Sequence, residues 1–450
     1  MRGENICRLE ESPTLEKSWS KDRHNLAIVF PNLYYGGVYS LGPLIVYNLV
    51  NHLDDWNCER RFLDYSDIRN FDVVGFTFQY ELDYYNLIKI LKKNNIPEDK
   101  NKREPWKIFF GGGPSVTLNS RPVEKYLDVI FLGDCEDSLP KVLEAYNLEM
   151  KKGKNNFDKK IFFENICNIE GVYVPGMSKR TISKVNLENV DYPLVQPLPV
   201  TCGKEFVFGN SFILELERGC PYNCKFCVIP TVSGFRYRKY DDIINIIDQG
   251  LKINSRSKVV IYSPSFVHPD RNKIMKYMTD KNIKFSVPSL RAELVDRKTL
   301  EIIYNGGQRS ITIAPESSER VRKLMNKNVK DESYLKLVKL AGEVGFKKVK
   351  LYLVVGFECE TEEDISNLVR LVKKCADAFG RRITASVNVL VPKLMSSSND
   401  WKVDKTKAKK KLKYIKDELK SYVNSGKVKI KIGDVNNSFV EWNLSVGEKI

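Results

Sequence analysis

Three cysteines in one short loop have the spacing of ligands to an iron–sulfur cluster. Cys220, Cys224 and Cys227 follow the pattern C-x3-C-x2-C, directly after an apolar run at 212–216 that is typical of a β-strand. Three thiolates can hold three irons of a [4Fe-4S] cluster and leave the fourth iron open to another ligand. An iron with an open position indicates a catalyst rather than an electron carrier.

Zinc and disulfides explain these cysteines less well. A structural zinc site commonly uses four Cys or His ligands in two spaced pairs. The sequence contains no second Cys pair, and its only histidines are His24, His52 and His268. Ten cysteines in 450 residues is an ordinary density, and the remaining ones are scattered, which argues against a disulfide framework.

The composition is that of a soluble globular protein, with 42% hydrophobic and 29% charged residues. No apolar run approaches the ~20 residues of a membrane span, and the first residues lack a signal-peptide pattern. We therefore expect a cytoplasmic protein with no membrane partner. The formal net charge is +16. The run 401–420 predicts a basic helix, and charge alone leaves both a solvated surface and an RNA-binding surface open.

Alternating strands and helices surround the cysteine loop in the second half of the chain. Strands are predicted near 211–217, 258–263, 283–290, 310–316, 348–356 and 383–391, with helices such as 241–254, 270–280 and 362–378 between them. This alternation predicts a partial (β/α)6 barrel at 206–400, whose chemistry would lie at the C-terminal ends of the strands. Residues 401–450 are expected to add the basic helix, a terminal strand and a small cap.

Residues 1–145 show a similar alternation, with strands predicted at 24–30, 73–78, 107–110 and 129–132 and helices at 40–52 and 82–94. The pattern predicts an α/β domain with an open, Rossmann-like parallel sheet. Glycines follow two of these strands, where a missing Cβ lets the backbone turn sharply or a ligand approach. Residues 146–205 are expected to connect the two domains and to form a hairpin from 171–175 and 182–185.

The cysteine motif resembles that of the radical S-adenosylmethionine (radical SAM) superfamily, and so do Ala314-Pro315-Glu316 and Val391-Pro392-Lys393. The resemblance implies that the three cysteines hold a [4Fe-4S] cluster, that SAM binds its open iron, and that Phe226 packs beside the adenine. A donor such as flavodoxin or ferredoxin would supply the electron that splits SAM into methionine and a 5′-deoxyadenosyl radical. That radical would take a hydrogen atom from the substrate.

The resemblance also assigns SAM-binding roles to the ends of other strands. Relatives often have Gly-Gly-Glu after the second strand to bind the methionine amino group, whereas this chain offers the hydroxyls of Ser263 and Ser265. Ser289 and Arg291 follow the third strand, and Arg291 could pair with the SAM carboxylate or form a surface salt bridge. Glu316 could bind the ribose or the sulfonium side of SAM, or could favour a helix N-terminus.

Residues 24–145 resemble the cobalamin (B12)-binding domain that precedes the barrel in many radical SAM enzymes. The resemblance rests on 30–34, 40–42, 76–82, 112–115 and 132–137, and it implies a cobalamin loop at Gly112, Gly113, Pro114 and Gly133. The motif D-x-H-x-x-G, whose His binds cobalt, is absent, and residues 32–37 stand in its place. Members without this His include both cobalamin binders and proteins that keep the fold alone, so cobalamin stays open.

We therefore predict a radical SAM enzyme, for which the sequence assigns neither a substrate nor catalytic residues. A cobalamin-dependent radical SAM methyltransferase is the alternative if cobalamin is bound. A non-catalytic, basic, RNA-associated iron–sulfur protein is an alternative of another class. The three-cysteine loop argues against it, because a purely structural cluster would usually have a fourth Cys.

Overall fold

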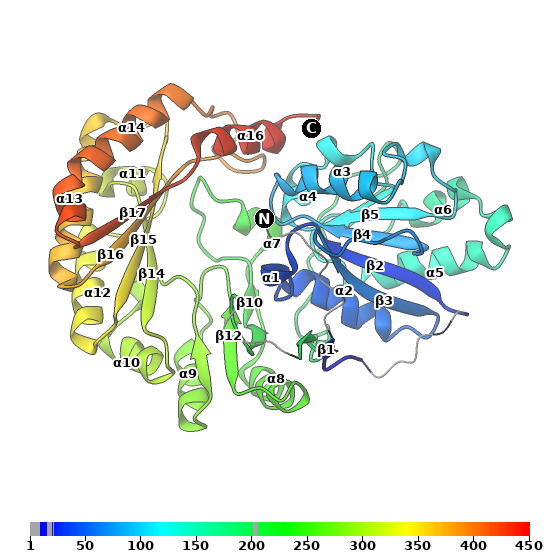
Figure 1. Ribbon diagram of the computed structural model, residues 1–450, viewed down its shortest axis with the longest axis horizontal. Coiled ribbons are helices and arrows are strands. Elements are labelled where there is room, and N and C mark those ends of the chain that lie inside the picture. The colour runs from blue at the N-terminus through cyan, green and yellow to red at the C-terminus, as the bar shows by residue number, and fades with distance from the viewer. Residues whose placement is uncertain (1–9, 16–19, 21, 201–205) are drawn as a thin grey trace. The chain divides into compact units, whose positions relative to one another are not determined.

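The computed structural model describes residues 10–15, 20, 22–200 and 206–450, which fall into two compact units (Figure 1). The first unit takes its residues from 1–213, 245–256 and 447–450, and the second from 214–244 and 257–446. Within the described ranges, none of the helices combines the length and the apolar character that crossing a membrane requires.

A six-stranded sheet forms the centre of the first unit, with the strand order β3-β2-β4-β5-β6-β7. Its neighbouring strands run parallel except for β6 and β7, which are antiparallel. Its strands are β2 (His24–Phe30), β3 (Trp56–Phe62), β4 (Val73–Thr77), β5 (Ile108–Gly112), β6 (Val129–Phe131) and β7 (Val172–Tyr173). Strands β1 (Glu11–Ser12) and β8 (Leu198–Pro199) pair with each other in a separate two-stranded sheet. The helices are α1 (Tyr34–Gly37), α2 (Leu41–Asn51), α3 (Asp83–Lys93), α4 (Pro114–Leu118), α5 (Ser138–Met150) and α6 (Lys159–Ile166).

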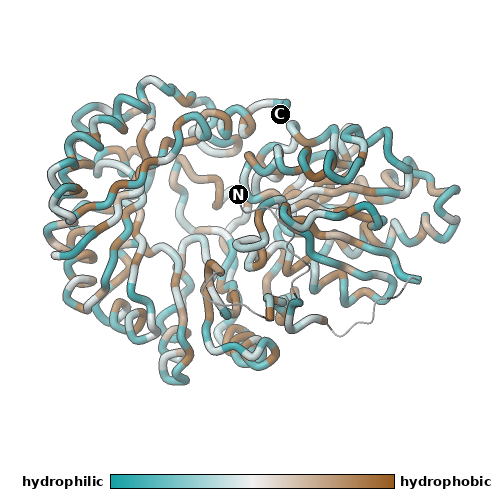
Figure 2. The backbone as a smooth tube through the Cα atoms, viewed as in Figure 1, coloured by the Kyte–Doolittle hydropathy of each residue, from teal (hydrophilic) through white to brown (hydrophobic). Residues whose placement is uncertain are grey.

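Helices cover both faces of this sheet because its strands are apolar on both sides. On one face, alternate side chains such as Ile28 and Phe110 pack in a buried cluster with residues of α2, α5 and α6. On the other face, the Phe78 and Tyr84 rings meet at 5.2 Å, which packs α3 against the sheet. The tube in Figure 2 is accordingly brown along these strands. Both layers agree with the burial expected of a parallel sheet.

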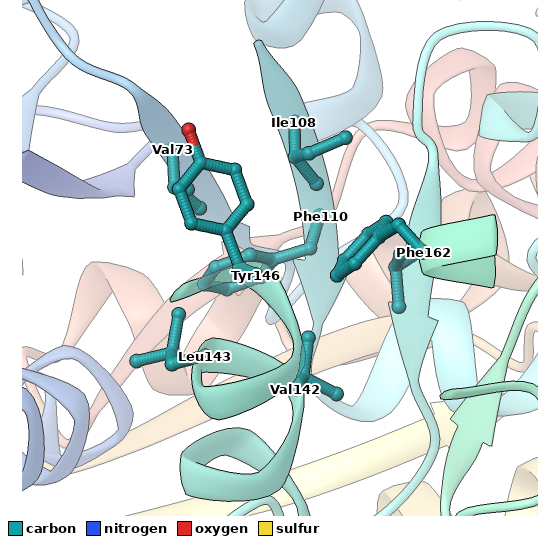
Figure 3. Close-up of a pocket in the computed structure, with 8 residues that line it drawn as sticks. Val73, Ile108, Phe110, Val142, Leu143, Tyr146 and Phe162 are labelled. Atoms are coloured by element: carbon teal, nitrogen blue, oxygen red, sulfur yellow. The ribbon is translucent and has the colours of Figure 1, made fainter. Parts of the chain in front are cut away.

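A small apolar gap lies inside the first of these two layers (Figure 3). Its lining is made of core residues from the sheet, α5 and α6: Val73, Ile108, Phe110, Val129, Val142, Leu143, Tyr146 and Phe162. The one polar group among them, the Tyr146 hydroxyl, already donates a hydrogen bond to the Trp106 carbonyl oxygen. The gap therefore belongs to core packing and offers no partner to a charged ligand.

The hairpin predicted from 171–175 and 182–185 is wrong. Val172 and Tyr173 pair with β6, and Ser183 forms a parallel bridge with Gly133 at the end of the same strand. Ser183 can approach because Gly133 and Gly171 lack side chains: a Cβ would stand 2.2 Å from the Ser183 carbonyl oxygen at Gly133 and 2.5 Å from the Ser183 Cβ at Gly171. Both segments thus add to the existing sheet instead of pairing with each other.

Parallel strands also form the centre of the second unit. The strand orders are β13-β12-β9 and β14-β15-β16-β17, and a single parallel bridge between Leu290 and Ile313 links the two sheets. The strands are β9 (Phe212–Glu215), β10 (Glu217–Arg218), β11 (Arg236–Tyr237), β12 (Lys258–Tyr262), β13 (Lys284–Ser286), β14 (Ser310–Glu316), β15 (Lys348–Val355), β16 (Ile383–Val389) and β17 (Val428–Ile432).

Helices alternate with these strands along the chain. They are α7 (Ile229–Ser233), α8 (Tyr240–Ile253), α9 (Arg271–Asp280), α10 (Arg297–Asn305), α11 (Glu319–Leu324), α12 (Asp331–Val344), α13 (Glu362–Phe379), α14 (Lys405–Glu418), α15 (Lys420–Asn424) and α16 (Val435–Val446). The predicted basic helix is α14, and the predicted terminal strand is β17, which joins the edge of the four-stranded sheet next to β16. The small cap expected after it is helix α16.

The glycine at the end of β6 gives a direct test of this packing. Gly133 and Gly153 both have positive φ angles, +84° and +87°, but a Cβ at Gly153 would meet nothing within 4 Å. We expect Gly153→Ala to cost about 1 kcal/mol, the backbone penalty alone. Gly133→Ala should cost at least about 2 kcal/mol more, because Ser183 must move away. Urea unfolding of the two variants measures the difference, and equal losses would contradict the packing argument.

Candidate iron–sulfur and SAM site

The cysteine loop begins and ends at one short pair of strands, β10 and β11. β10 pairs with β11 in antiparallel fashion, with Arg218 opposite Arg236. Gly219 has a φ of +76°, and a Cβ there would lie 1.5 Å from the Gly234 carbonyl oxygen. No residue with a side chain fits this approach. The two ends of the loop are therefore closed by backbone contacts.

The middle of the loop is held by residues that follow two other strands of the unit. The Lys225 N–H donates to the Met325 carbonyl oxygen over 3.0 Å, and the Ser397 N–H donates to the Lys225 carbonyl oxygen over 3.0 Å. The Asn326 side-chain amide donates to the Asn223 carbonyl oxygen over 2.8 Å. Met325 follows β14 and α11, and Ser397 follows β16, so the loop lies at the carboxyl ends of these parallel strands.

Phe226 anchors the same loop in an apolar cluster. Its ring meets the Phe357 ring edge to face, with centroids 5.7 Å apart and an angle of 79° between the planes. Val321, Met325 and Leu390 are the buried neighbours in this cluster. Packing of Phe226 beside the adenine of SAM stays a prediction.

No disulfide joins the cysteines in the described ranges, and the three of the loop are buried or partly buried. Loss of solvation raises the pKa of Cys227 to about 11, with smaller upward contributions from Cys224 and Cys220. Burial also raises the pKa of Cys224, against the opposing charges of Lys327 and Arg291. The metal-free loop thus keeps these two thiols protonated at neutral pH, and metal binding would release protons.

These thiols fit a cluster better than a single ion. Among the described residues, no three His, Cys, Asp or Glu side chains converge closely enough to hold one metal ion. A [4Fe-4S] cluster makes a different demand, because each thiolate binds its own iron and the sulfurs stay apart. Three thiols within electrostatic reach of one another, on one loop closed by backbone contacts, meet that demand.

Ser263 and Ser265 lie together, and a residue that the sequence analysis did not assign holds them. The Glu217 Oε1 accepts hydrogen bonds from Ser263 Oγ over 2.5 Å, Ser265 Oγ over 3.3 Å and the Val267 N–H over 3.0 Å. Glu217 is buried, and its Oε2 has no hydrogen-bond partner in the described part of the chain. Its position three residues before Cys220 could have indicated in the sequence that Glu217 lies beside the cysteine loop.

The side chain of Arg291 packs against the cysteine loop. Its guanidinium stands 3.4 Å from the centroid of the Tyr222 ring, and its Nη2 is 2.5 Å from Glu293 Oε1. The salt bridge allowed by the sequence is therefore present, and it holds Arg291 beside the loop. Ser289 is half-buried and precedes Leu290, which bridges to β14. Their roles toward SAM stay predictions.

Glu316 ends β14 with a φ of +63°. Its Oε1 is 2.9 Å from Lys327 Nζ, and Lys327 also donates to the Ala314 carbonyl oxygen over 2.7 Å. The alternative of a helix N-terminus does not hold for Glu316, because α11 begins at Glu319 and Ser318 is its N-cap. Lys327 is the second residue that sequence reasoning did not assign.

The candidate cobalamin-loop residues lie in the first unit. Gly112 ends β5, Pro114 begins α4, and Gly133 follows β6, where its N–H donates to the Thr117 hydroxyl over 3.0 Å. A Cβ at Gly113 would lie 2.6 Å from the Phe78 carbonyl oxygen. At Gly113 and Gly133, another segment of the backbone occupies the space that a side chain would need. This packing alone explains why both residues are glycine.

Comparisons with known proteins identify the family of this chain. Residues 214–372 match the family described as the radical SAM superfamily, and residues 64–175 match radical SAM proteins, N-terminal. An uncharacterised protein of Methanocaldococcus jannaschii is 33% identical over 88% of this chain and 83% of its own length. The chain belongs to the radical SAM superfamily.

Two further comparisons are more distant. Bacteriochlorophyllide d methyltransferase of Chlorobaculum tepidum is 23% identical over 68% of this chain and 63% of its own length. The solved structure of the cobalamin-dependent radical SAM enzyme OxsB, with aqua-cobalamin and SAM bound, is 12% identical and superposes with a TM-score of 0.53. That likeness covers 78% of this chain and only 52% of OxsB, and it shows the fold alone.

The Glu217 contacts predict a difference between two substitutions. Glu217→Ala leaves one buried and two partly buried donors without an acceptor, and we expect a loss of about 3 kcal/mol of stability. Glu217→Gln keeps one carbonyl oxygen for the same donors and should lose about 1 kcal/mol. Urea unfolding of the metal-free variants measures both. A Glu217→Ala variant as stable as the parent protein would show that Glu217 does not organise this strand end.

Proposed function

We propose that this chain reductively cleaves SAM at a [4Fe-4S] cluster held by Cys220, Cys224 and Cys227, and uses the radical to modify a substrate. The observation that carries the proposal is the three-cysteine loop, pinned at the carboxyl ends of parallel strands. When bound, the cluster would supply one electron to break the C5′–S bond of SAM, giving methionine and a 5′-deoxyadenosyl radical. The electron would come from flavodoxin or ferredoxin in a reducing cytoplasm.

The residues around the loop would position SAM. In this proposal Phe226 contacts the adenine, Arg291 and Ser289 bind the methionine carboxylate, and Ser263 and Ser265 accept from the amino group. Glu316 would accept from the ribose hydroxyls. We also propose that residues 206–400 act as a partial (β/α)6 barrel, that 1–145 form a B12-binding-like domain and that 401–450 extend the barrel. The predicted connector 146–205 instead adds α6 and β7 to the first unit. The matched radical SAM families and the strand order support this arrangement.

The cysteines give the first test. Cys224→Ala removes one of three ligands, so we expect SAM cleavage to fall below detection and the iron content to drop. Cys359→Ala is the matched control, because it removes a partly buried free thiol that has no role in the proposal. Production of 5′-deoxyadenosine under anaerobic conditions with dithionite measures the activity. Undiminished cleavage by Cys224→Ala would overturn the cluster assignment.

A cobalamin-dependent methyltransferase is the second candidate. The fold shared with OxsB is compatible with a cobalamin-binding domain, and the methyltransferase among the relatives supports methyl transfer. Strand order reverses beside β2, since β3 and β4 lie on its two sides, and ligands of open parallel sheets bind beyond the carboxyl ends at such a point. Exposed apolar side chains follow both strands there, namely Leu33 and Tyr35 after β2 and Tyr80 after β4. They would suit the face of a corrin ring. At the histidine position of the D-x-H-x-x-G motif this chain has Tyr34, whose hydroxyl donates to Glu11 Oε1 over 2.7 Å.

Metal analysis separates the two candidates. Protein purified without oxygen from a host supplied with cobalamin should contain about four irons per chain. One cobalt per chain in addition would favour the methyltransferase, and no cobalt would favour hydrogen abstraction by the SAM-derived radical alone. About four irons per chain without SAM cleavage, together with retained RNA affinity, would favour the non-catalytic RNA-associated alternative. No iron after reconstitution would overturn the cluster assignment.

A further inference from the structure

One face of the four-stranded sheet in the second unit is polar and basic. Helices α12 and α13 pack on the opposite face, where residues such as Val349, Leu351 and Val387 are buried (Figure 1). The residues between them point the other way, because side chains alternate along a strand. They are half-buried or exposed, and Figure 2 shows the resulting alternation of brown and teal along these strands.

The pairing register assembles this polar face into two rows. Thr312, Lys350, Thr384 and Lys429 stand opposite one another across β14, β15, β16 and β17. The next row contains Tyr352, Ser386 and Lys431. Strand spacings put Lys429 and Lys431 about 7 Å apart, and Lys350 about 10 Å from Lys429, measured between Cα atoms. Three cations and four hydroxyls therefore share one face.

The charge on this face is not balanced by the protein. Lys429 and Lys431 are exposed and make no hydrogen bond or ion pair with any described residue. Lys350 donates to the Tyr352 hydroxyl over 2.9 Å, which is a neutral acceptor. The one carboxylate on the described strands of this face, Glu316, is paired with Lys327. The face thus carries a net positive charge beside groups that donate hydrogen bonds.

Protection of a sheet edge explains only part of this pattern. Lysines on an edge strand discourage pairing with another chain, and β17 is the edge strand here. Lys350, however, lies in β15, which has a neighbouring strand on both sides. A cation in the interior of a sheet has no edge to protect. Its position in register with Lys429 instead indicates a binding face.

Lysines together with hydroxyls suit a phosphate group. Arginine pairs with carboxylate and phosphate alike, whereas lysine binds phosphate as a point charge. The strands of this face, β14 to β17, contain no arginine. Hydroxyls of Thr312, Thr384 and Ser386 would add donors to phosphate oxygens.

We propose that this face binds the phosphate group of the substrate, which makes the substrate a phosphorylated small molecule. The inference rests on the proposed function. The Ser386–Lys431 row lies three residues, about 10 Å, before the end of β16. The cysteine loop is held at that end of the sheet through Ser397. A phosphate at the lysines would therefore leave the rest of a small molecule directed toward the proposed site of radical formation.

Ribose 5-phosphate is a suitable probe for reconstituted enzyme, with ribose and ribonate as neutral and carboxylate controls at the same ionic strength. We expect calorimetry to show binding of the phosphate ester, and at least tenfold weaker binding of both controls. The double variant Lys429→Gln/Lys431→Gln should bind the phosphate ester about tenfold to a hundredfold more weakly, as expected for a lost charged hydrogen bond. Lys409→Gln/Lys413→Gln is the matched control, since it removes two exposed lysines of α14.

Lysine acetylation read by mass spectrometry gives a second measurement that does not depend on activity. Ribose 5-phosphate should protect Lys429 and Lys431 and leave Lys409 and Lys413 reactive. If the two double variants weakened binding equally, the attraction would be nonspecific and the proposal would be overturned. Binding of ribonate as tight as that of the phosphate ester would also overturn it. No binding of the phosphate ester would also overturn it. In either case SAM cleavage by the same preparation still tests the proposed function separately.

Discussion

The close approach of Gly219 to the Gly234 carbonyl oxygen is the constraint on which the site depends. A Cβ would come within 1.5 Å of that oxygen, so the chain can cross here only as glycine. The crossing brings both ends of the cysteine loop to the short β10–β11 pairing. Hydrogen bonds from and to Lys225 then fix its middle. These backbone contacts hold the three thiols on one closed loop.

Sequence patterns predicted the strands that are apolar and continuous. The expected strands at 24–30 and 310–316 coincide with β2 and β14, and the expected helix at 362–378 is one residue shorter than α13. β3 was missed because Arg60 and Arg61 interrupt its apolar pattern. Both are buried, and Arg60 reaches the Glu11 carboxylate and the Pro197 carbonyl oxygen, a pairing that only the folded chain provides.

The candidate site was predictable to the extent that it is local in sequence. The cysteine spacing identified the loop, and the strand ends located Ser263, Ser265 and Arg291. The groups that hold them come from other strands. Glu217 organises the two serines from the neighbouring strand, and Lys327 reaches back to Glu316 across 11 residues. Such partners are set by the register and crossing of strands, which a single sequence does not reveal.

The two carboxylates at these strand ends share one design. Glu316 uses Oε1 for Lys327, and Glu217 uses Oε1 for three donors, while the Oε2 of Glu217 accepts no hydrogen bond in the described chain. A carboxylate held through one oxygen has its orientation fixed before any ligand arrives. The second oxygen then meets an incoming donor without first reorganising the side chain. Polar groups of this kind are costly to stability when buried, and their place at the carboxyl ends of the strands, around the cysteine loop, gives that cost a functional reason.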